Sequence, residues 1–147
     1  MSHRARAPVD EIDEASVVSS LGPNVKHTRI IVTRYGGPDA LQVLEEESPE
    51  PTAGEARVKV LAAGVSLPDV MMPEGIHPET PPLPFTPGWD LVGLVDRLGD
   101  GVSGIQPGQV VAALPITGAY AEFVSLPQGE LVPVPLQCPS AVRSSSM

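Results

Sequence analysis

The chain has 147 residues and a formal net charge of −9, which suits one domain with one hydrophobic core. The negative charge would repel nucleic acid and acidic membrane surfaces, so both are excluded as partners. One cysteine, Cys138, leaves no internal disulfide and fits a reducing compartment. The sequence therefore predicts a soluble cytoplasmic protein, because the chain also holds no apolar run of the ~20 residues that span a membrane and starts without the pattern of a signal or transit peptide.

The composition predicts the fold class. Eighteen prolines and 14 glycines disfavour long helices, and aromatic residues make up only 3% of the chain. We expect a mainly β domain of short antiparallel strands joined by sharp turns, with a core of Val, Leu, Ile and Ala.

Order is expected to begin after a polar extension over residues 1–26. Arg29–Thr33 reads as a strand, Tyr35–Asp39 as a turn and Leu41–Leu44 as the returning strand. The glutamates that follow predict a solvated acidic loop: Glu45, Glu46, Glu47, Glu50 and Glu55.

The clearest strand is 57–65, in which Val58, Val60 and Ala62 share one face while Arg57 and Lys59 point the other way. The segment 64–69 interrupts it, and a helical turn entered from Asp69 is expected over 70–75.

A stiff bend is predicted at 84–90. Pro84 and Pro87 restrict the backbone, and Gly88 permits a turn or a close approach. The bend leads into a strand over Leu91–Leu98, with the pair Trp89-Asp90 at the junction.

Three more strands are predicted in the remaining chain, over 109–114, 119–124 and 130–134, and the last is an edge strand because it contains Pro133. Residues 137–147 read as an irregular tail.

The segment Gly99–Gly104 matches the dinucleotide-binding pattern G-x-G-x-x-G. That pattern requires a helix to start at its third glycine, so that the helix N-terminus faces the pyrophosphate. Ile105-Gln106-Pro107-Gly108 cannot start a long helix. The segment is therefore predicted to be a hairpin turn.

No metal site is predicted, because zinc needs three or four convergent ligands and the candidates His3, His27, His77 and Cys138 are scattered. His77 is expected to be a solvated side chain. Ser66 and Asp69, three residues apart, suit either a cap at a helix start or a functional pair.

Several motifs in order resemble the N-terminal, GroES-like domain of the medium-chain dehydrogenase/reductase superfamily, most closely its zinc-free quinone oxidoreductase branch. The resemblance runs from about Arg29 to Leu136. The segments that carry it are Tyr35–Pro38, Val58–Asp69, Pro84–Gly93, Gly99–Val102, Pro107–Val111 and Gly118–Phe123.

The resemblance implies that residues 27–136 form a partly open β-barrel, one wall of a cleft whose other wall is a Rossmann domain, and that NADPH is the hydride donor. Zinc-dependent relatives carry cysteine at position 66 and His-Glu at 89-90. Ser66, Trp89 and Asp90 stand there instead, which implies that the catalytic zinc is absent.

The implied chemistry is hydride transfer to a quinone or an α,β-unsaturated carbonyl. The implied cleft residues are Ser66, as a hydrogen-bond donor, Asp69, as a loop anchor, and Met71, Met72, Trp89 and Asp90.

The sequence contains no recognisable Rossmann half, so the isolated chain is expected to bind NADPH negligibly and to lack turnover. The alternative is a stand-alone GroES-like binding or assembly module. Without a partner domain, an exposed apolar wall around Val65, Leu67, Met71, Met72 and Trp89 is expected to promote self-association.

Overall fold

Two antiparallel sheets organise residues 25–135, the part of the chain that the computed structural model describes. The smaller sheet pairs β1 (Lys26–Val32) with β2 (Leu41–Glu47). The larger sheet has the strand order β6-β3-β4-β5-β7. Its members are β3 (Glu55–Ala62), β4 (Leu91–Leu98), β5 (Val110–Ala113), β6 (Phe123–Pro127) and β7 (Val132–Pro133).

Helix is scarce in this part of the chain. It consists of η1 (Pro38–Ala40), α2 (Leu67–Met71) and η2 (Gln128–Glu130). The prediction of a mainly β, antiparallel fold is confirmed, and so is the placing of the last strand, β7, at a sheet edge.

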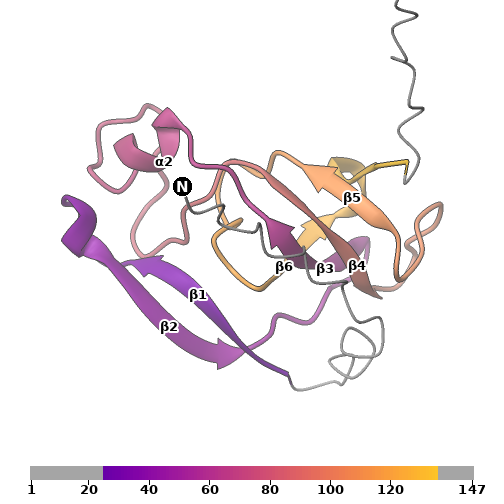
Figure 1. The fold of residues 1–147 in the computed structure, drawn as a ribbon. Helices are drawn as coiled ribbons and strands as arrows, with labels where there is room; N and C mark the ends of the chain where they lie inside the picture. The colour runs from indigo at the N-terminus through magenta and orange to yellow at the C-terminus, as the bar shows by residue number, and fades with distance from the viewer. Residues whose placement is uncertain (1–24, 136–147) are drawn as a thin grey trace, which may run out of the picture.

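The two sheets meet as a partly open barrel. In Figure 1 the β1–β2 ribbon lies beside the larger sheet, and α2 lies at the far end of β1. Isolated bridges join β1 to the rest of the molecule at Arg29↔Ala121 and Val32↔Phe85. The segment before β6 connects the sheets, because Glu122 donates its N–H to Thr28 O and accepts from Val60 N.

The main core lies on one face of the larger sheet. In β4, alternate residues Leu91, Gly93 and Val95 point inward. The core is aliphatic, as the composition predicts; its buried members are Ala56, Val58, Leu91, Val95, Ile105, Val111, Ala113, Ala119, Leu126 and Leu131.

A second, smaller core fixes the proline-rich bend. Val32, Met72 and Phe85 are buried together, and Leu83 and Trp89 pack against them. His77 stands edge-on to Trp89, with ring centroids 5.7 Å apart. His77 is therefore half-buried, and the prediction that it is a solvated side chain is wrong, because the bend folds back over it.

The acidic run is a second correction. Residues 45–47 belong to β2 instead of a loop, and they pair with 26–28 of β1. Basic side chains on β1 compensate the glutamates, since Arg29 Nε lies 2.6 Å from Glu46 Oε1 and Lys26 Nζ lies 3.4 Å from Glu45 Oε1. Cross-strand pairs of opposite charge favour this strand.

Arg57 differs most from its sequence-based placement. It points away from the main core as predicted, yet its side chain is only 1% exposed. Ser48, Glu50 and Asp96 surround it with hydrogen bonds, and its guanidinium lies over the Phe123 ring at 5.2 Å. The face of β3 opposite the main core is therefore covered at Arg57.

In the second half of the chain, most observed strand and turn boundaries agree with those predicted from the sequence. β4 has the predicted bounds, and Gly99–Gly104 lies in the loop between β4 and β5, which confirms the hairpin turn. The strand expected over 119–124 begins only at Phe123. The predicted extension before Lys26 and the tail after 136, with His3 and Cys138, fall almost entirely outside the described residues.

Candidate active-site corner

The short helix α2 starts at a side-chain cap. Ser66 is its N-cap and forms a capping box with Asp69. Asp69 Oδ2 accepts hydrogen bonds from both the N–H and the hydroxyl of Ser66, each at 2.8 Å. The capping interpretation of this pair is confirmed, and the helix begins at Leu67, before Asp69.

Gly88 brings the proline-rich bend against the segment before β6. Its φ is +115°, and a Cβ at this position would lie 2.6 Å from Tyr120 N and 2.7 Å from Ala119 Cβ. Only glycine fits such a position without strain. The approach is closed by hydrogen bonds from Tyr120 N to Pro87 O (3.0 Å) and from Gly118 N to Thr86 O (2.8 Å).

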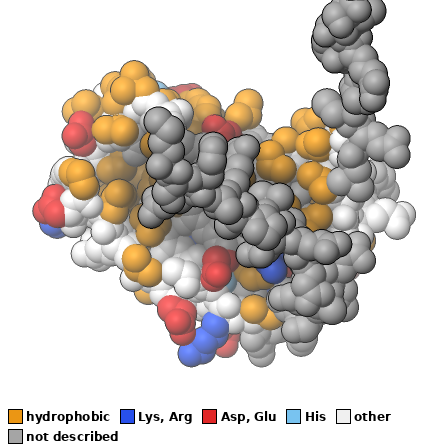
Figure 2. All heavy atoms as spheres, in the orientation of Figure 1, with side chains coloured by type: hydrophobic (Ala, Val, Ile, Leu, Met, Phe, Trp, Pro, Cys, Tyr) orange, Lys and Arg blue, Asp and Glu red, His pale blue; other side chains and the backbone are white. Residues whose placement is uncertain are grey.

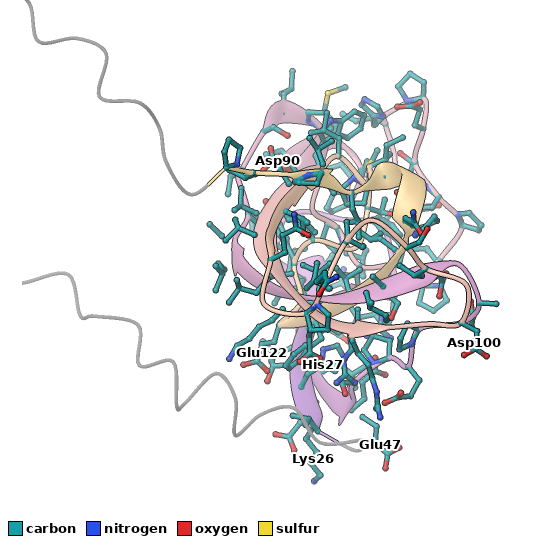
Figure 3. The ribbon with its side chains drawn as sticks, turned by 90° about the vertical axis from the view of Figure 1, so that its right-hand side faces the viewer. Lys26, His27, Glu47, Asp90, Asp100 and Glu122 are labelled. Atoms are coloured by element: carbon teal, nitrogen blue, oxygen red, sulfur yellow. The ribbon has the colours of Figure 1, made fainter. Side chains whose placement is uncertain are left out.

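Gly64, just before α2, is hydrogen-bonded both to the proline-rich bend and to the segment before β6. Its N–H donates to Asp90 Oδ1 at 2.7 Å, and its carbonyl accepts from the Tyr120 hydroxyl at 3.1 Å. We call Gly64, Ser66, Asp69, Asp90 and Tyr120 the Gly64 corner. Figure 3 places Asp90 at the opposite end of the molecule from Lys26 and Glu47, the paired ends of the small sheet.

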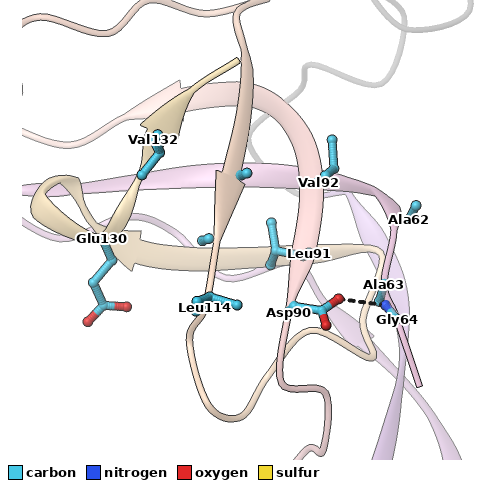
Figure 4. A pocket seen from close by; sticks show the side chains of 11 residues that line it. Ala62, Ala63, Gly64, Asp90, Leu91, Val92, Leu114, Glu130 and Val132 are labelled. Carbon is cyan, nitrogen blue, oxygen red and sulfur yellow. Dashed lines mark hydrogen bonds between the residues drawn. The ribbon is translucent and has the colours of Figure 1, made fainter. Parts of the chain in front are cut away.

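A large apolar cavity lies on one side of this corner. It has a volume of about 840 Å³ and is formed by the ends of β3, β4, β5 and β7. Figure 4 shows Asp90 turned toward Gly64 at its margin, with Glu130 as the other carboxylate of the lining. We call it the sheet pocket; its remaining lining residues are Ala62, Ala63, Leu91, Val92, Ala112, Ala113, Leu114 and Val132.

A smaller cavity of about 240 Å³ lies on the other side, between the turn after β1 and α2; we call it the loop pocket. The polar groups of its lining are the Asp69 carboxylate and the Tyr120 hydroxyl, both from the Gly64 corner, and the Glu74 carboxylate. The other lining residues are Gly36, Gly37, Pro38, Leu41, Val65, Val70 and Pro73.

The electrostatics of the corner keep Tyr120 protonated. Burial, followed by the negative charges of Asp69 and Asp90, raises the pKa of Tyr120 to about 12. The phenol therefore acts as a hydrogen-bond donor at neutral pH, and it is not a general base there.

Asp69 is only 6% exposed. Its Oδ2 takes both hydrogen bonds from Ser66, whereas its Oδ1 is buried and has no hydrogen-bond partner among residues 25–135. An unsatisfied buried carboxylate oxygen is costly. The Ser66 hydroxyl donates its single proton to Asp69. It is therefore not free to donate a hydrogen bond to a substrate, which differs from the role that the family resemblance implied.

The sequence-predicted cleft residues separate into two groups. Ser66, Asp69 and Asp90 come together at the Gly64 corner. Met72 is 1% exposed and belongs to the second core with Trp89 packed against it, and neither lines either pocket. The expectation that Met72 forms an exposed cleft wall is therefore wrong. Met71, at the end of α2, also lies outside both linings.

The exposed apolar surface is formed by residues that precede Met72, just before and within α2. Val65 is 81% exposed and Leu67 70% exposed, and Val70 is also open to solvent. Figure 2 shows hydrophobic side chains gathered at the upper left, the region that α2 and its following loop occupy in Figure 1.

Tyr120 is the site residue that sequence reasoning missed. Its motif, 118–123, supported only the family resemblance, because nothing in the local sequence indicates that it faces Gly64 and Asp69. The signal available was Gly88, whose missing side chain makes the approach of this segment possible.

The described residues contain neither a candidate metal cluster nor a candidate membrane-spanning helix. Within residues 25–135, His, Cys, Asp and Glu side chains do not gather in groups of three that could hold a metal ion. None of the helices in this part of the chain combines the length and apolar character needed to cross a membrane.

Comparison with known proteins identifies the family. Residues 52–136 match the alcohol dehydrogenase GroES-like domain. The human synaptic vesicle membrane protein VAT-1 homolog-like is 33% identical over 107 residues, which are 73% of this chain and 26% of that protein. Rat quinone oxidoreductase is 33% identical over 108 residues, 72% of this chain and 33% of that protein. The chain thus spans about a quarter to a third of the length of these relatives.

Solved structures agree. Escherichia coli quinone oxidoreductase, complexed with NADPH, superposes with a TM-score of 0.69 at 30% identity, covering 74% of this chain and 33% of that one. A probable oxidoreductase from Mycobacterium abscessus gives 0.70 at 33% identity, covering 76% and 36%. The chain therefore belongs to the medium-chain dehydrogenase/reductase superfamily, among its quinone oxidoreductase-like members, and carries the GroES-like domain of that family.

Proposed function

We propose that residues 27–136 are the substrate-side domain of an NADPH-dependent, zinc-independent oxidoreductase that reduces quinones or α,β-unsaturated carbonyls by hydride transfer. The observation that carries the proposal is the Gly64 corner, which sets Asp69, Asp90 and the Tyr120 hydroxyl between two apolar cavities. Quinone oxidoreductases among the relatives, one of them complexed with NADPH, support the reaction class.

The described residues do not fit the phosphates of a dinucleotide. Carboxylates line both cavities, with Asp90 and Glu130 in the sheet pocket and Asp69 and Glu74 in the loop pocket, and they would repel a pyrophosphate. The glycines of 99–104 lie in a hairpin, where no helix N-terminus faces them. We therefore propose that a separate Rossmann domain holds NADPH, which supplies the hydride when bound.

The chain's own residues would orient the substrate and exclude water. Val65, Leu67 and Val70 offer an apolar surface beside the corner, and Tyr120 offers a hydroxyl that stays protonated at neutral pH. Zinc independence is supported by the residues at the family's zinc-ligand positions, Ser66, Trp89 and Asp90. Asp69 and Gly64 already engage Ser66 and Asp90.

The test uses Trp89, the only tryptophan, as a fluorescent reporter during NADPH titration. We expect no saturable change for this chain alone. A version joined to the cofactor-binding domain of a related quinone oxidoreductase should bind NADPH and reduce a quinone in the presence of EDTA. Saturable binding by the chain alone, or a joined protein that binds NADPH yet reduces neither quinones nor enones, would refute the proposal.

We also propose that the exposed apolar surface leads the isolated chain to self-associate in the cytoplasm, the compartment that its single cysteine favours. Val65 and Leu67 carry most of this surface. Sedimentation velocity should reveal species larger than a monomer, and replacing both residues with serine should remove them. A clean monomer for the unmodified chain at high concentration would contradict this expectation.

A further inference from the structure

The sheet pocket combines an apolar lining with two negative charges. Its volume of about 840 Å³ falls in the range of small-molecule sites, roughly 300–1,000 Å³. Alanine, valine and leucine side chains and one glycine form the lining apart from Asp90 and Glu130, and no Lys, Arg or His among residues 25–135 contributes to it. An occupant of this cavity therefore meets apolar groups and two carboxylates.

Asp90 is held at the margin of the pocket with one oxygen accessible. Its Oδ1 accepts a hydrogen bond from Gly64 N at 2.7 Å, drawn as a dashed line in Figure 4. Its Oδ2 accepts none from the described residues, and it is not buried, in contrast to Oδ1 of Asp69. A fixed and accessible carboxylate oxygen can accept a hydrogen bond from a bound cation without first losing a partner.

Glu130 supplies the second charge from a different element. It is the last residue of η2, its side chain is exposed, and it lines the same pocket. Within the described part of the chain, neither Glu130 nor Asp90 forms an ion pair with a basic side chain. Uncompensated carboxylates on a chain of net charge −9 raise the local concentration of cations.

The two kinds of surface select the class of ligand. An anion of any shape would be repelled by Asp90 and Glu130, and a bare metal ion would gain nothing from the apolar lining. An organic ammonium ion can cover apolar side chains with its body and keep its charged head at the wet margin, beside the carboxylates. Leu114 is 68% exposed and Val132 62% exposed, so both are available to such a body.

We propose that the sheet pocket binds small organic cations, in which an ammonium group is attached to an aromatic or aliphatic body. The ammonium group donates a hydrogen bond to Asp90 Oδ2 and is attracted by Glu130, while the body lies on the apolar lining. This binding site goes beyond the hydride transfer proposed above and needs neither NADPH nor a quinone.

The test uses three ligands with the same body and different charge. The full chain is titrated with 1-naphthylmethylammonium, 1-naphthylmethanol and 1-naphthoate, and backbone amide shifts are followed by NMR. We expect the ammonium ion to bind on the order of tenfold more tightly than the alcohol, because each of two partly exposed ion pairs contributes a few-fold. The naphthoate should bind most weakly, and shifts should appear at Ala62, Val92 and Leu114.

The preference should also shrink when the ionic strength is raised, because salt screens exposed charges. Equal affinities of the ammonium ion and the alcohol, absence of binding by all three ligands, or shifts confined to residues outside the lining would overturn the proposal.

Three amide variants locate the charges. Asp90→Asn keeps an acceptor for Gly64 N, and Glu130→Gln alters an exposed side chain; each should lower the ammonium-to-alcohol ratio about threefold. Asp100→Asn is the matched control, because it removes the same charge from the 99–104 hairpin, far from Asp90 in Figure 3, and it should retain the ratio. A ratio that survives both pocket variants, or that falls equally in Asp100→Asn, would overturn the assignment. Should Asp90→Asn fail to fold, Glu130→Gln and its control still decide.

Discussion

Two aspartates of this domain are buried almost equally but are treated in opposite ways. Asp96, 8% exposed, receives a hydrogen bond from the guanidinium of Arg57, a buried cation that also contacts Ser48 and Glu50. Asp69, 6% exposed, receives its hydrogen bonds from neutral groups of Ser66 alone and lines a cavity. The first carboxylate is paired with a buried cation, whereas the second has only neutral hydrogen-bond donors, although each keeps one buried oxygen without a partner among the described residues.

The difference follows from position in the fold. Asp96 lies within β4 at a bulge in the β3–β4 pairing, between Val95, which pairs with Val58, and Arg97, which pairs with Arg57. Asp69 lies in a five-residue helix at a loop, where it joins the capping box and shares a cavity lining with the turn at 36–38 and Tyr120. Interior strands thus hold the charges that stabilise the domain, and loops hold those that can serve binding.

The largest expected effect compares the two carboxylates directly. Asp96→Asn removes the buried negative charge beside Arg57 and leaves only the exposed Glu50 to compensate it, so the free energy of unfolding should fall by about 3 kcal/mol. Asp69→Asn should cost about 1 kcal/mol or less, since its partners are neutral. Urea denaturation measures both; equal losses would abolish the distinction.

Gly88→Ala should have the next largest effect on stability. Its added Cβ would meet the backbone of Tyr120 and the positive φ would be strained, so we expect a loss of about 2–3 kcal/mol and altered NMR shifts at Tyr120. Gly101→Ala is the matched control, because its φ is +78° but nothing lies within 4 Å of its Cβ position; its loss should stay near 1 kcal/mol. Similar losses for both would show that close packing at the corner is unimportant.

Ser66→Ala tests the cap. It removes the hydroxyl donor to Asp69 Oδ2 but keeps the backbone donor, so stability should fall by about 1 kcal/mol. Thermal unfolding monitored by circular dichroism is the measurement. Ser103→Ala is the control, because the backbone N–H of Ser103 is engaged rather than its hydroxyl; it should have little effect, and an equal loss there would argue against the capping role.

The smallest effect concerns pH. Because the folded-state pKa of Tyr120 is raised to about 12 from the ordinary value of about 10, its stabilising contribution is fully present below pH 10. It is lost as the pH rises toward 12. Tyr120→Phe should flatten the fall in stability over this window and remove a late step from the ultraviolet phenolate titration. Persistence of that step in the variant would show that it does not belong to Tyr120.

Much of the fold was predictable because the strands follow local rules. Leu91–Leu98 was placed with its observed bounds, since a proline-stiffened bend and a glycine-rich turn delimit an apolar run. The acidic run at 45–47 was mistaken for a loop because its pairing partners are residues 26–28 of β1, which lie outside its local sequence. Local composition carries no information about such a partner.

The candidate site was predictable only in part, for the same reason. Ser66 and Asp69 are three residues apart, so their capping contact could be read from spacing. Met72 follows the same helix, and sequence alone could not show that it turns toward Val32 and Phe85 instead of the surface.

The sequence by itself determined the strand-rich class, the turn at the glycine-rich motif, the cap of α2 and the family, because each depends on neighbours along the chain or on ordered motifs. Tertiary structure alone decided that Arg57 is buried against Asp96, that Tyr120 reaches Gly64, and that Asp69 shares a cavity lining with the 36–38 turn. These contacts join residues separated by tens of positions, and the packing of strands and loops sets which of them meet.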